Sequence, residues 1–264
     1  MIFLAVIMMV FTQYIGLAQA SEDAMIKKSN VAGQFYSANP EILSKEVEDF
    51  LAKDLQAAAD KKAAVLILPH AGYVYSGPVA AYGYKAVSAQ SYKTIIIIGL
   101  SHHHRFEGFA IWPEGRFETP LGSVEVDADF SKQIMQAAPE VKSISEAFDK
   151  EHSLEVQLPF LQKIFRDFKI VPLLTGQPNF DNCEKLASVL ANLIGHREDI
   201  LLLISSDMSH YRDEETTRTM DKRALEMIQH LKAKEFWWML TISRRGKLRK
   251  SLTWHRGAAR ISAS

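Results

Sequence analysis

Histidine and aspartate residues follow three apolar segments of the sequence, at the point where each segment ends. The segment "AAVLILPHAGY" carries His70, and "KTIIIIGLSHHH" ends in three consecutive histidines, the first of which is His102. The segment "DILLLISSDMSHY" carries Asp207 and His210. Two or three imidazoles with a carboxylate suit iron, copper or zinc, and fewer than four protein ligands leave positions open for substrate. These residue types predict a metal or ligand site, provided that the three segment ends meet.

Two further candidates, His152 and Glu155, lie in "DKEHSLEV". The surrounding "EHSLEVQLPFLQKIF" predicts a helix interrupted by Pro159, and residues three apart on a helix share one face. The pair then ligates a metal or orients a ligand's second nitrogen, or else forms the acidic N-terminus of an exposed helix. In the run that begins at His102, at most two histidines reach one cavity, because successive residues of an extended loop face opposite ways. A serine nucleophile at Ser205 or Ser206 is not favoured, because the sequence lacks a G-x-S-x-G turn there.

The elements that must position these residues are strands alternating with helices. Four nearly continuous apolar segments predict buried strands, and amphipathic segments between them predict helices. The first helix is expected to start at Asn39 as N-cap, and the helix in "GPVAAYGYKAV" is expected to bury Val79 and Tyr82. This alternation predicts an α/β fold with a mostly parallel or mixed central sheet and helices on both faces. Ligands bind at the carboxyl ends of the strands in such sheets, which is where the histidines lie.

The composition limits the other classes of function. Lys and Arg number 31, as do Asp and Glu, so the zero net charge gives no sign of specific nucleic-acid binding. The charge is unevenly distributed, because residues 241–264 carry seven Lys and Arg and no acid. The single cysteine, Cys183, excludes an intrachain disulfide and an all-thiolate metal site, and we expect it to be a buried spectator.

The N-terminal segment predicts the location of the protein. Residues 1–20 contain an apolar stretch followed by "AQA", the pattern of a secretory signal peptide cleaved after Ala20. With that signal, the protein is expected to be exported or periplasmic, and without it cytoplasmic. The apolar stretch is too short for a membrane span, so membrane contact is expected only through the signal.

Several motifs together resemble the Memo family, whose prokaryotic members include the AmmeMemoRadiSam system protein B. They are "VAGQFYSANPE", "PHAGYVYSGPVAAYGYKAV", "GLSHHHRF", "TPLGSVEVD", "DKEHSLEVQLPFLQ", "IVPLLTG" and "SSDMSHY", in that order. The family is similar in fold to the class III extradiol dioxygenases, which are non-haem iron enzymes. The resemblance implies His70 and His102 as metal ligands, and it implies Asp207, His210, His152 and Glu155 as catalytic residues around the same pocket.

One feature of the family is missing from this sequence. Its third metal ligand is a cysteine in a Cys-Gly motif beyond the "SSDMSHY" loop, and this chain has none there. We therefore expect weak binding of a divalent iron, copper or zinc ion by two imidazoles with a carboxylate. The resemblance ends near Leu240, and the tail at 241–264 is interpreted either as a basic arm for an anionic surface or as the product of a frameshift or truncation. Its composition favours the second interpretation and predicts disorder.

These observations give a signal peptide at 1–20, one Memo-like domain at 28–240 that is incomplete at its C-terminus, and the tail. They leave two classes of function open. One is a metal-dependent, dioxygenase-like oxidoreductase that acts on an unidentified small molecule. The other is a non-catalytic binding module that uses the same pocket for a peptide or another anionic ligand.

Overall fold

The apolar segments form a six-stranded sheet in the computed structural model. The structure describes residues 26–53 and 62–237, so the predictions for residues 1–20 and 241–264 lie outside the described residues. Four neighbouring strands run parallel, in the order β2 (Val65–Leu68), β9 (Ile200–Ser205), β3 (Thr94–Leu100) and β8 (Lys169–Thr175). Next to β8, β4 (Phe109–Ile111) runs antiparallel, and β7 (Val141–Ser143) follows it at the edge. The predicted α/β fold with a mixed central sheet is confirmed.

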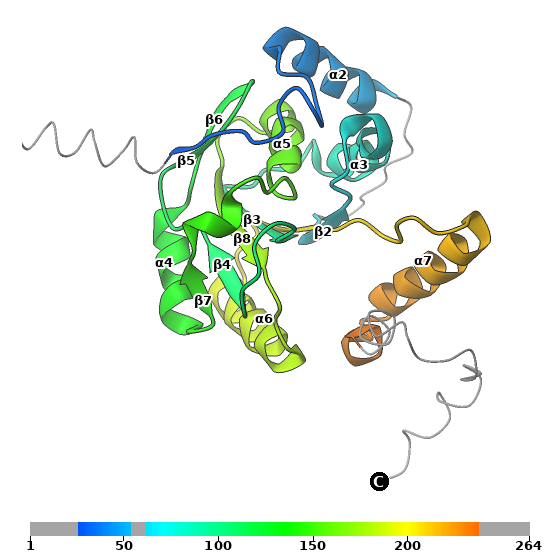
Figure 1. Cartoon of the computed structure of the whole chain (residues 1–264). Helices are drawn as coiled ribbons and strands as arrows, with labels where there is room; N and C mark the ends of the chain where they lie inside the picture. The colour runs from blue at the N-terminus through cyan, green and yellow to red at the C-terminus, as the bar shows by residue number, and fades with distance from the viewer. Residues whose placement is uncertain (1–25, 54–61, 238–264) are drawn as a thin grey trace, which may run out of the picture. The chain divides into compact units, whose positions relative to one another are not determined.

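Helices cover both faces of this sheet, because β3 is apolar on both sides. Ile95 and Ile97 pack in one core and Ile96 in the other, as the alternation of side chains along a strand requires. The first core includes residues of α2 (Pro40–Ala52), α3 (Tyr73–Val87) and α5 (Leu158–Ile164). The second includes residues of α4 (Ala128–Ala137) and α6 (Phe180–Ile194), on the other side of the sheet in Figure 1.

Helix α2 begins where the sequence predicts. The side chain of Asn39 accepts hydrogen bonds from the backbone N–H groups of Glu41 and Ile42 at 2.9 and 3.0 Å, and Pro40 occupies the first turn. The described part of the helix ends at Ala52. Helix α6 ends at Ile194, and Gly195 follows with a φ of +52°, a left-handed conformation that favours glycine.

The predicted buried face of α3 is partly wrong. The side chains of Val79 and Tyr82 are exposed, and α3 instead buries residues such as Ala80, Ala81 and Tyr84. Helix α3 has apolar residues on both sides, so periodicity alone does not select its inner face. The choice follows from close packing at its small residues, since a Cβ added to Gly83 would lie 2.4 Å from Leu68 Cδ2.

A small second sheet attaches the N-terminal segment to the domain. Strand β1 (Ile26–Lys27) pairs in parallel with β5 (Arg116–Thr119), which pairs in antiparallel with β6 (Gly122–Glu125). The chain then continues from β1 towards Tyr36, which is buried in the first core. This segment therefore forms part of the packed structure, although it precedes the first helix.

The chain divides after Met208 into two compact units, and the second is described by itself. It contains α7 (Glu214–Gln229), whose N-cap Asp213 accepts a hydrogen bond from the backbone N–H of Thr216 at 2.8 Å. The predicted domain at 28–240 crosses this division and stays a prediction. Among the described residues, no helix combines the length and apolar character needed to cross a membrane.

Candidate metal centre at the strand ends

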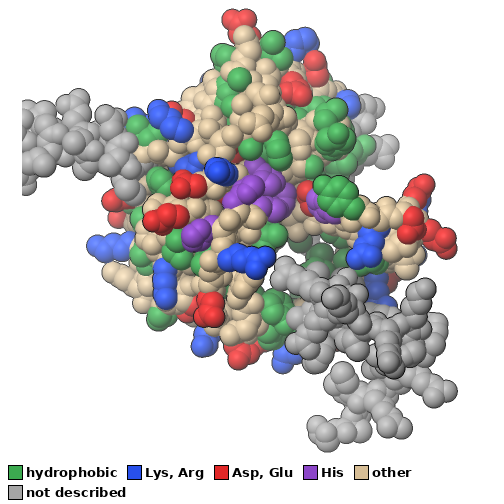
Figure 2. Space-filling model, in the orientation of Figure 1, with side chains coloured by type: hydrophobic (Ala, Val, Ile, Leu, Met, Phe, Trp, Pro, Cys, Tyr) green, Lys and Arg blue, Asp and Glu red, His purple; other side chains and the backbone are tan. Residues whose placement is uncertain are grey.

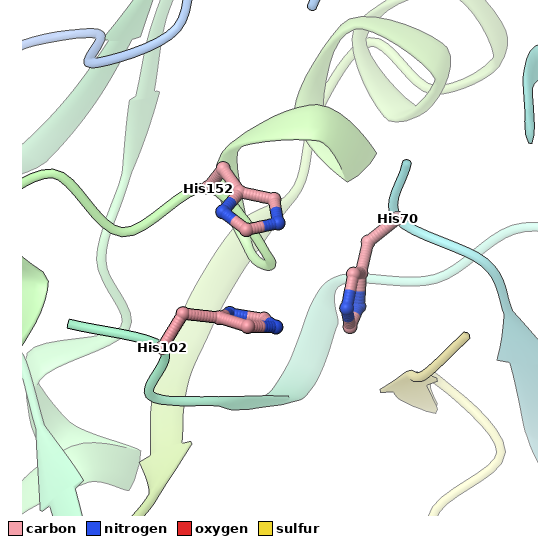
Figure 3. Close-up of side chains that lie close together, drawn as sticks. All are labelled: His70, His102 and His152. Carbon is pink, nitrogen blue, oxygen red and sulfur yellow. The ribbon is translucent and has the colours of Figure 1, made fainter. Parts of the chain in front are cut away.

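The carboxyl ends of two parallel strands and one loop bring three histidines together. His70 follows β2 and His102 follows β3, while His152 comes from the loop before α5. One ring nitrogen of each histidine lies within 4.8 Å of the corresponding nitrogens of the other two. Figure 3 shows the three side chains. Only about 5% of the side chain of His70 is exposed, against 31% for His102 and 14% for His152. The cluster therefore opens to solvent on the His102 side, and Figure 2 shows histidine side chains gathered on this face of the molecule.

His152 reaches the cluster from a loop, so the predicted helix over 151–165 is wrong at its start. A single 3₁₀ turn spans Glu155–Gln157, and the α-helix begins only at Leu158. Pro159 explains the late start, because proline is tolerated in the first turn of a helix but not in its interior. His152 and Glu155 consequently do not share a helix face. The loop instead supplies a third imidazole, where the sequence led us to expect only two.

Glu151 organises two of the three histidines, and the sequence reasoning did not identify it. Its Oε1 accepts from His102 Nδ1 at 3.0 Å and from the backbone N–H groups of His152 and Ser153 at 2.9 and 2.8 Å. Its Oε2 accepts from the backbone N–H of His102 at 2.6 Å. A carboxylate directly before a candidate histidine was the available signal, because metal-binding histidines commonly donate their second ring N–H to a carboxylate.

Asp207 and Ser205 lie beside His70. The Asp207 Oδ1 accepts from the backbone N–H of His70 at 2.6 Å, and Oδ2 lies 4.0 Å from His70 Nε2. The ring Nδ1 of His70 lies 3.0 Å from Ser205 Oγ. His70 is thus held by its backbone N–H and by its ring Nδ1.

The local environment gives the three imidazoles different proton affinities. Burial lowers the pKa of His70 below its usual value, and burial lowers the pKa of His152 to about 4. The hydrogen bond from its ring to Glu151 raises the pKa of His102. Burial opposes ionisation of Glu151, but the hydrogen bonds from His102 and Ser153 outweigh it and lower the pKa of Glu151 to about 2. At neutral pH the site therefore contains a carboxylate and two neutral imidazoles, and His102 is the imidazole for which a proton competes most strongly with a metal.

Glu155 does not belong to this cluster of imidazoles. Its carboxylate accepts from the backbone N–H of Asn30 at 2.5 Å, from that of Val31 at 3.0 Å and from the Tyr36 hydroxyl at 2.6 Å. It therefore anchors the N-terminal segment. That segment reaches the site through Phe35, whose ring lies 4.7 Å from the ring of His152 and which the sequence reasoning also missed.

The other two histidines of the run after β3 lie outside the cluster. His103 extends beyond the cluster, with its ring 6.5 Å from that of His152, and the ring of His104 lies near Phe106. His210 belongs to the second unit, where its ring lies 5.8 Å from that of Tyr211. Its participation in the site stays a prediction.

Comparisons with known proteins agree with the motifs. The model of the family described as Memo-like protein matches residues 27–245. A MEMO1 family protein of Sulfolobus acidocaldarius is 38% identical over 220 residues, which cover 78% of this chain and 78% of the relative. One from Caldivirga maquilingensis is 34% identical over 223 residues, or 81% and 79% of the two chains. One from Saccharolobus solfataricus is 39% identical over 214 residues, or 76% and 75%.

Proposed function

Because the chain belongs to the Memo family, we propose that its pocket holds a divalent iron, copper or zinc ion through His70, His102 and His152. The observation that carries the proposal is the convergence of three imidazole nitrogens within 4.8 Å on an edge that is open to solvent. The donor set fits such an ion, since imidazole is a preferred ligand of zinc, copper and iron. Three imidazoles also provide a complete protein ligand set without a cysteine.

The chain's own residues prepare this site in distinct ways. Glu151 accepts the Nδ1 proton of His102 and so leaves the Nε2 lone pair available. Burial keeps His70 and His152 neutral at physiological pH, as ligation requires. The Asp207 carboxylate, 4.0 Å from His70 Nε2, is placed to take or return a proton beside the pocket. A bound ion would supply a Lewis acid with positions open for a small molecule.

We further propose that the reaction is a metal-dependent oxidation similar to that of the extradiol dioxygenases, with Asp207 and His210 as acid–base groups. Family resemblance and the imidazole-rich, partly open site support this class. A direct test is oxygen uptake by the Fe(II)-loaded protein with a panel of catechols, compared with His70→Ala. Uptake that depends on His70 is expected, and no uptake with any catechol would contradict the dioxygenase-like reaction without affecting the metal site.

Metal stoichiometry tests the metal site itself. Titration of the metal-free protein with Zn²⁺ should give about one ion per chain, with affinity reduced more than tenfold in His70→Ala and in His152→Ala. His196→Ala is the matched control, because His196 is exposed and lies after α6, outside the cluster. Equal Zn²⁺ affinity in the wild type and all three variants would overturn the proposal.

A further inference from the structure

A chain of buried hydrogen bonds lies behind His70. The Tyr84 hydroxyl donates to Gln157 Oε1, and Gln157 Nε2 donates to Pro69 O at 3.0 Å and to Ser205 Oγ at 2.8 Å. Ser205 Oγ donates to the backbone carbonyl of Ser153 and lies 3.0 Å from His70 Nδ1. Tyr84, Gln157, Ser205 and His70 are all at most 4% exposed. No competing water contact is therefore needed to satisfy these groups, and the protons can be placed by counting donors and acceptors.

The orientation of the Gln157 amide is the first step in that count. The carbonyl of Pro69 carries no hydrogen, so the amide atom that faces it must be the NH₂ group. The amide oxygen then faces Tyr84, whose hydroxyl donates to it. One amide hydrogen points to Pro69 O, and the other points to Ser205 Oγ.

The single hydroxyl proton of Ser205 is the second step. The carbonyl oxygen of Ser153 has no hydrogen, so its close contact with Ser205 Oγ requires the serine proton between the two oxygens. Ser205 Oγ then has two lone pairs left, and Gln157 Nε2 donates to one of them. The contact with His70 Nδ1 uses the other lone pair, so Nδ1 must carry a proton and donate it.

We infer that Ser205, oriented by Gln157, is a positioning residue that holds His70 in the tautomer protonated on Nδ1, with the lone pair on Nε2. Which ring nitrogen of a metal-binding histidine carries the proton is set by the hydrogen bond that the other nitrogen makes. His102 reaches the same tautomer through the carboxylate of Glu151. The acceptor at His70 Nδ1 is a neutral hydroxyl, whereas the acceptor at His102 Nδ1 is a carboxylate. Where this inference concerns a metal ion, it rests on the proposed function.

Nitrogen NMR of the metal-free protein tests the tautomer directly. Long-range ¹H–¹⁵N spectra of the ¹⁵N-labelled wild type at neutral pH, with His70 assigned by the loss of its signals in His70→Gln, should show Nδ1 protonated and Nε2 unprotonated. Ser205→Ala should shift His70 toward a mixture of tautomers or the Nε2-protonated form. Ser205→Thr keeps a hydroxyl and should preserve the wild-type pattern. Ser131→Ala is the matched control, because Ser131 is fully buried in α4 and its hydroxyl has no hydrogen-bond partner among the described residues.

Zn²⁺ titration of the same proteins adds a second measurement. Affinity should fall about 10–100-fold in Ser205→Ala and stay near the wild-type value in Ser205→Thr and Ser131→Ala. If Ser205→Ala does not fold, the wild-type spectrum alone decides, since Nε2 protonation of His70 there would overturn the inference. An unchanged tautomer in folded Ser205→Ala would overturn it as well. Failure of the wild type to bind Zn²⁺, with Nδ1 protonated, would contradict the proposed function and leave the tautomer assignment standing.

Discussion

Replacing Glu151 with glutamine changes one atom of the site and removes an acceptor that four donors require. Three N–H groups converge on Oε1, from the His102 ring and from the backbones of His152 and Ser153. The backbone N–H of His102 points to Oε2. A glutamine has one acceptor oxygen, so in its better orientation the amide NH₂ opposes the backbone N–H of His102 in place of an acceptor.

The expected magnitude follows from that lost hydrogen bond. A buried donor left without a partner costs about 1–3 kcal/mol, so Glu151→Gln should lower the free energy of unfolding by that amount. Weaker orientation of His102 should also reduce Zn²⁺ affinity about 10–100-fold. The affinity is best compared at pH 8, because loss of the carboxylate lowers the pKa of His102 and thereby reduces proton competition at lower pH.

Urea unfolding and calorimetric Zn²⁺ titration measure the two effects separately. Glu125→Gln is the matched control, because Glu125 is exposed and its carboxylate lies 3.4 Å from the ammonium group of the exposed Lys169. That control should change stability by less than about 0.5 kcal/mol. If Glu151→Gln matched the wild type in both stability and affinity, the carboxylate would not organise the histidines as described.

Three further changes probe the surroundings of the site. The Zn²⁺ affinity of the wild type should fall as the pH drops from about 8 to about 6, because the raised pKa of His102 lets a proton compete with the metal for its ring. An affinity that does not change over this pH range would contradict proton competition at His102. Glu155→Ala should lower the free energy of unfolding, measured in urea, by roughly 3 kcal/mol, since three donors lose their acceptor and two of them are buried. The Zn²⁺ affinity of the folded variant should be unchanged, and a large loss of affinity would show that Glu155 contributes to the site. Gly99→Ala should lower the free energy of unfolding by about 1–3 kcal/mol and weaken Zn²⁺ binding, because the added Cβ would lie 2.4 Å from Ser153 Oγ, next to His152. A variant as stable as the wild type would show that the loop adapts to the added methyl group.

The four main strands and their ends were predictable because they depend on local patterns. Apolar runs with β-branched residues mark β2, β3, β8 and β9, and parallel pairing then brings the residues after β2, β3 and β9 to one edge. His70, His102 and Asp207 could be placed on that edge from the sequence for this reason. The inner face of α3 could not be predicted from the sequence, because the side of the helix that carries Val79 and Tyr82 is as apolar as the opposite side.

The remaining parts of the site depend on contacts between distant segments. His152 joins the cluster from an irregular loop, whose course no periodic pattern specifies. The position of Phe35 against His152 depends on the anchoring of the N-terminal segment by Glu155. Ser205 was visible in the sequence, but its contact with His70 follows from the pairing of β2 with β9 and from the buried Gln157.

X-ray absorption by the Zn²⁺-loaded protein tests the central claim most directly, because it reports the atoms bound to the ion. The spectrum should show three imidazole nitrogens at about 2.0–2.1 Å in the wild type and one fewer in His152→Ala. An ion without imidazole ligands, or identical spectra for the two proteins, would contradict a site formed by His70, His102 and His152.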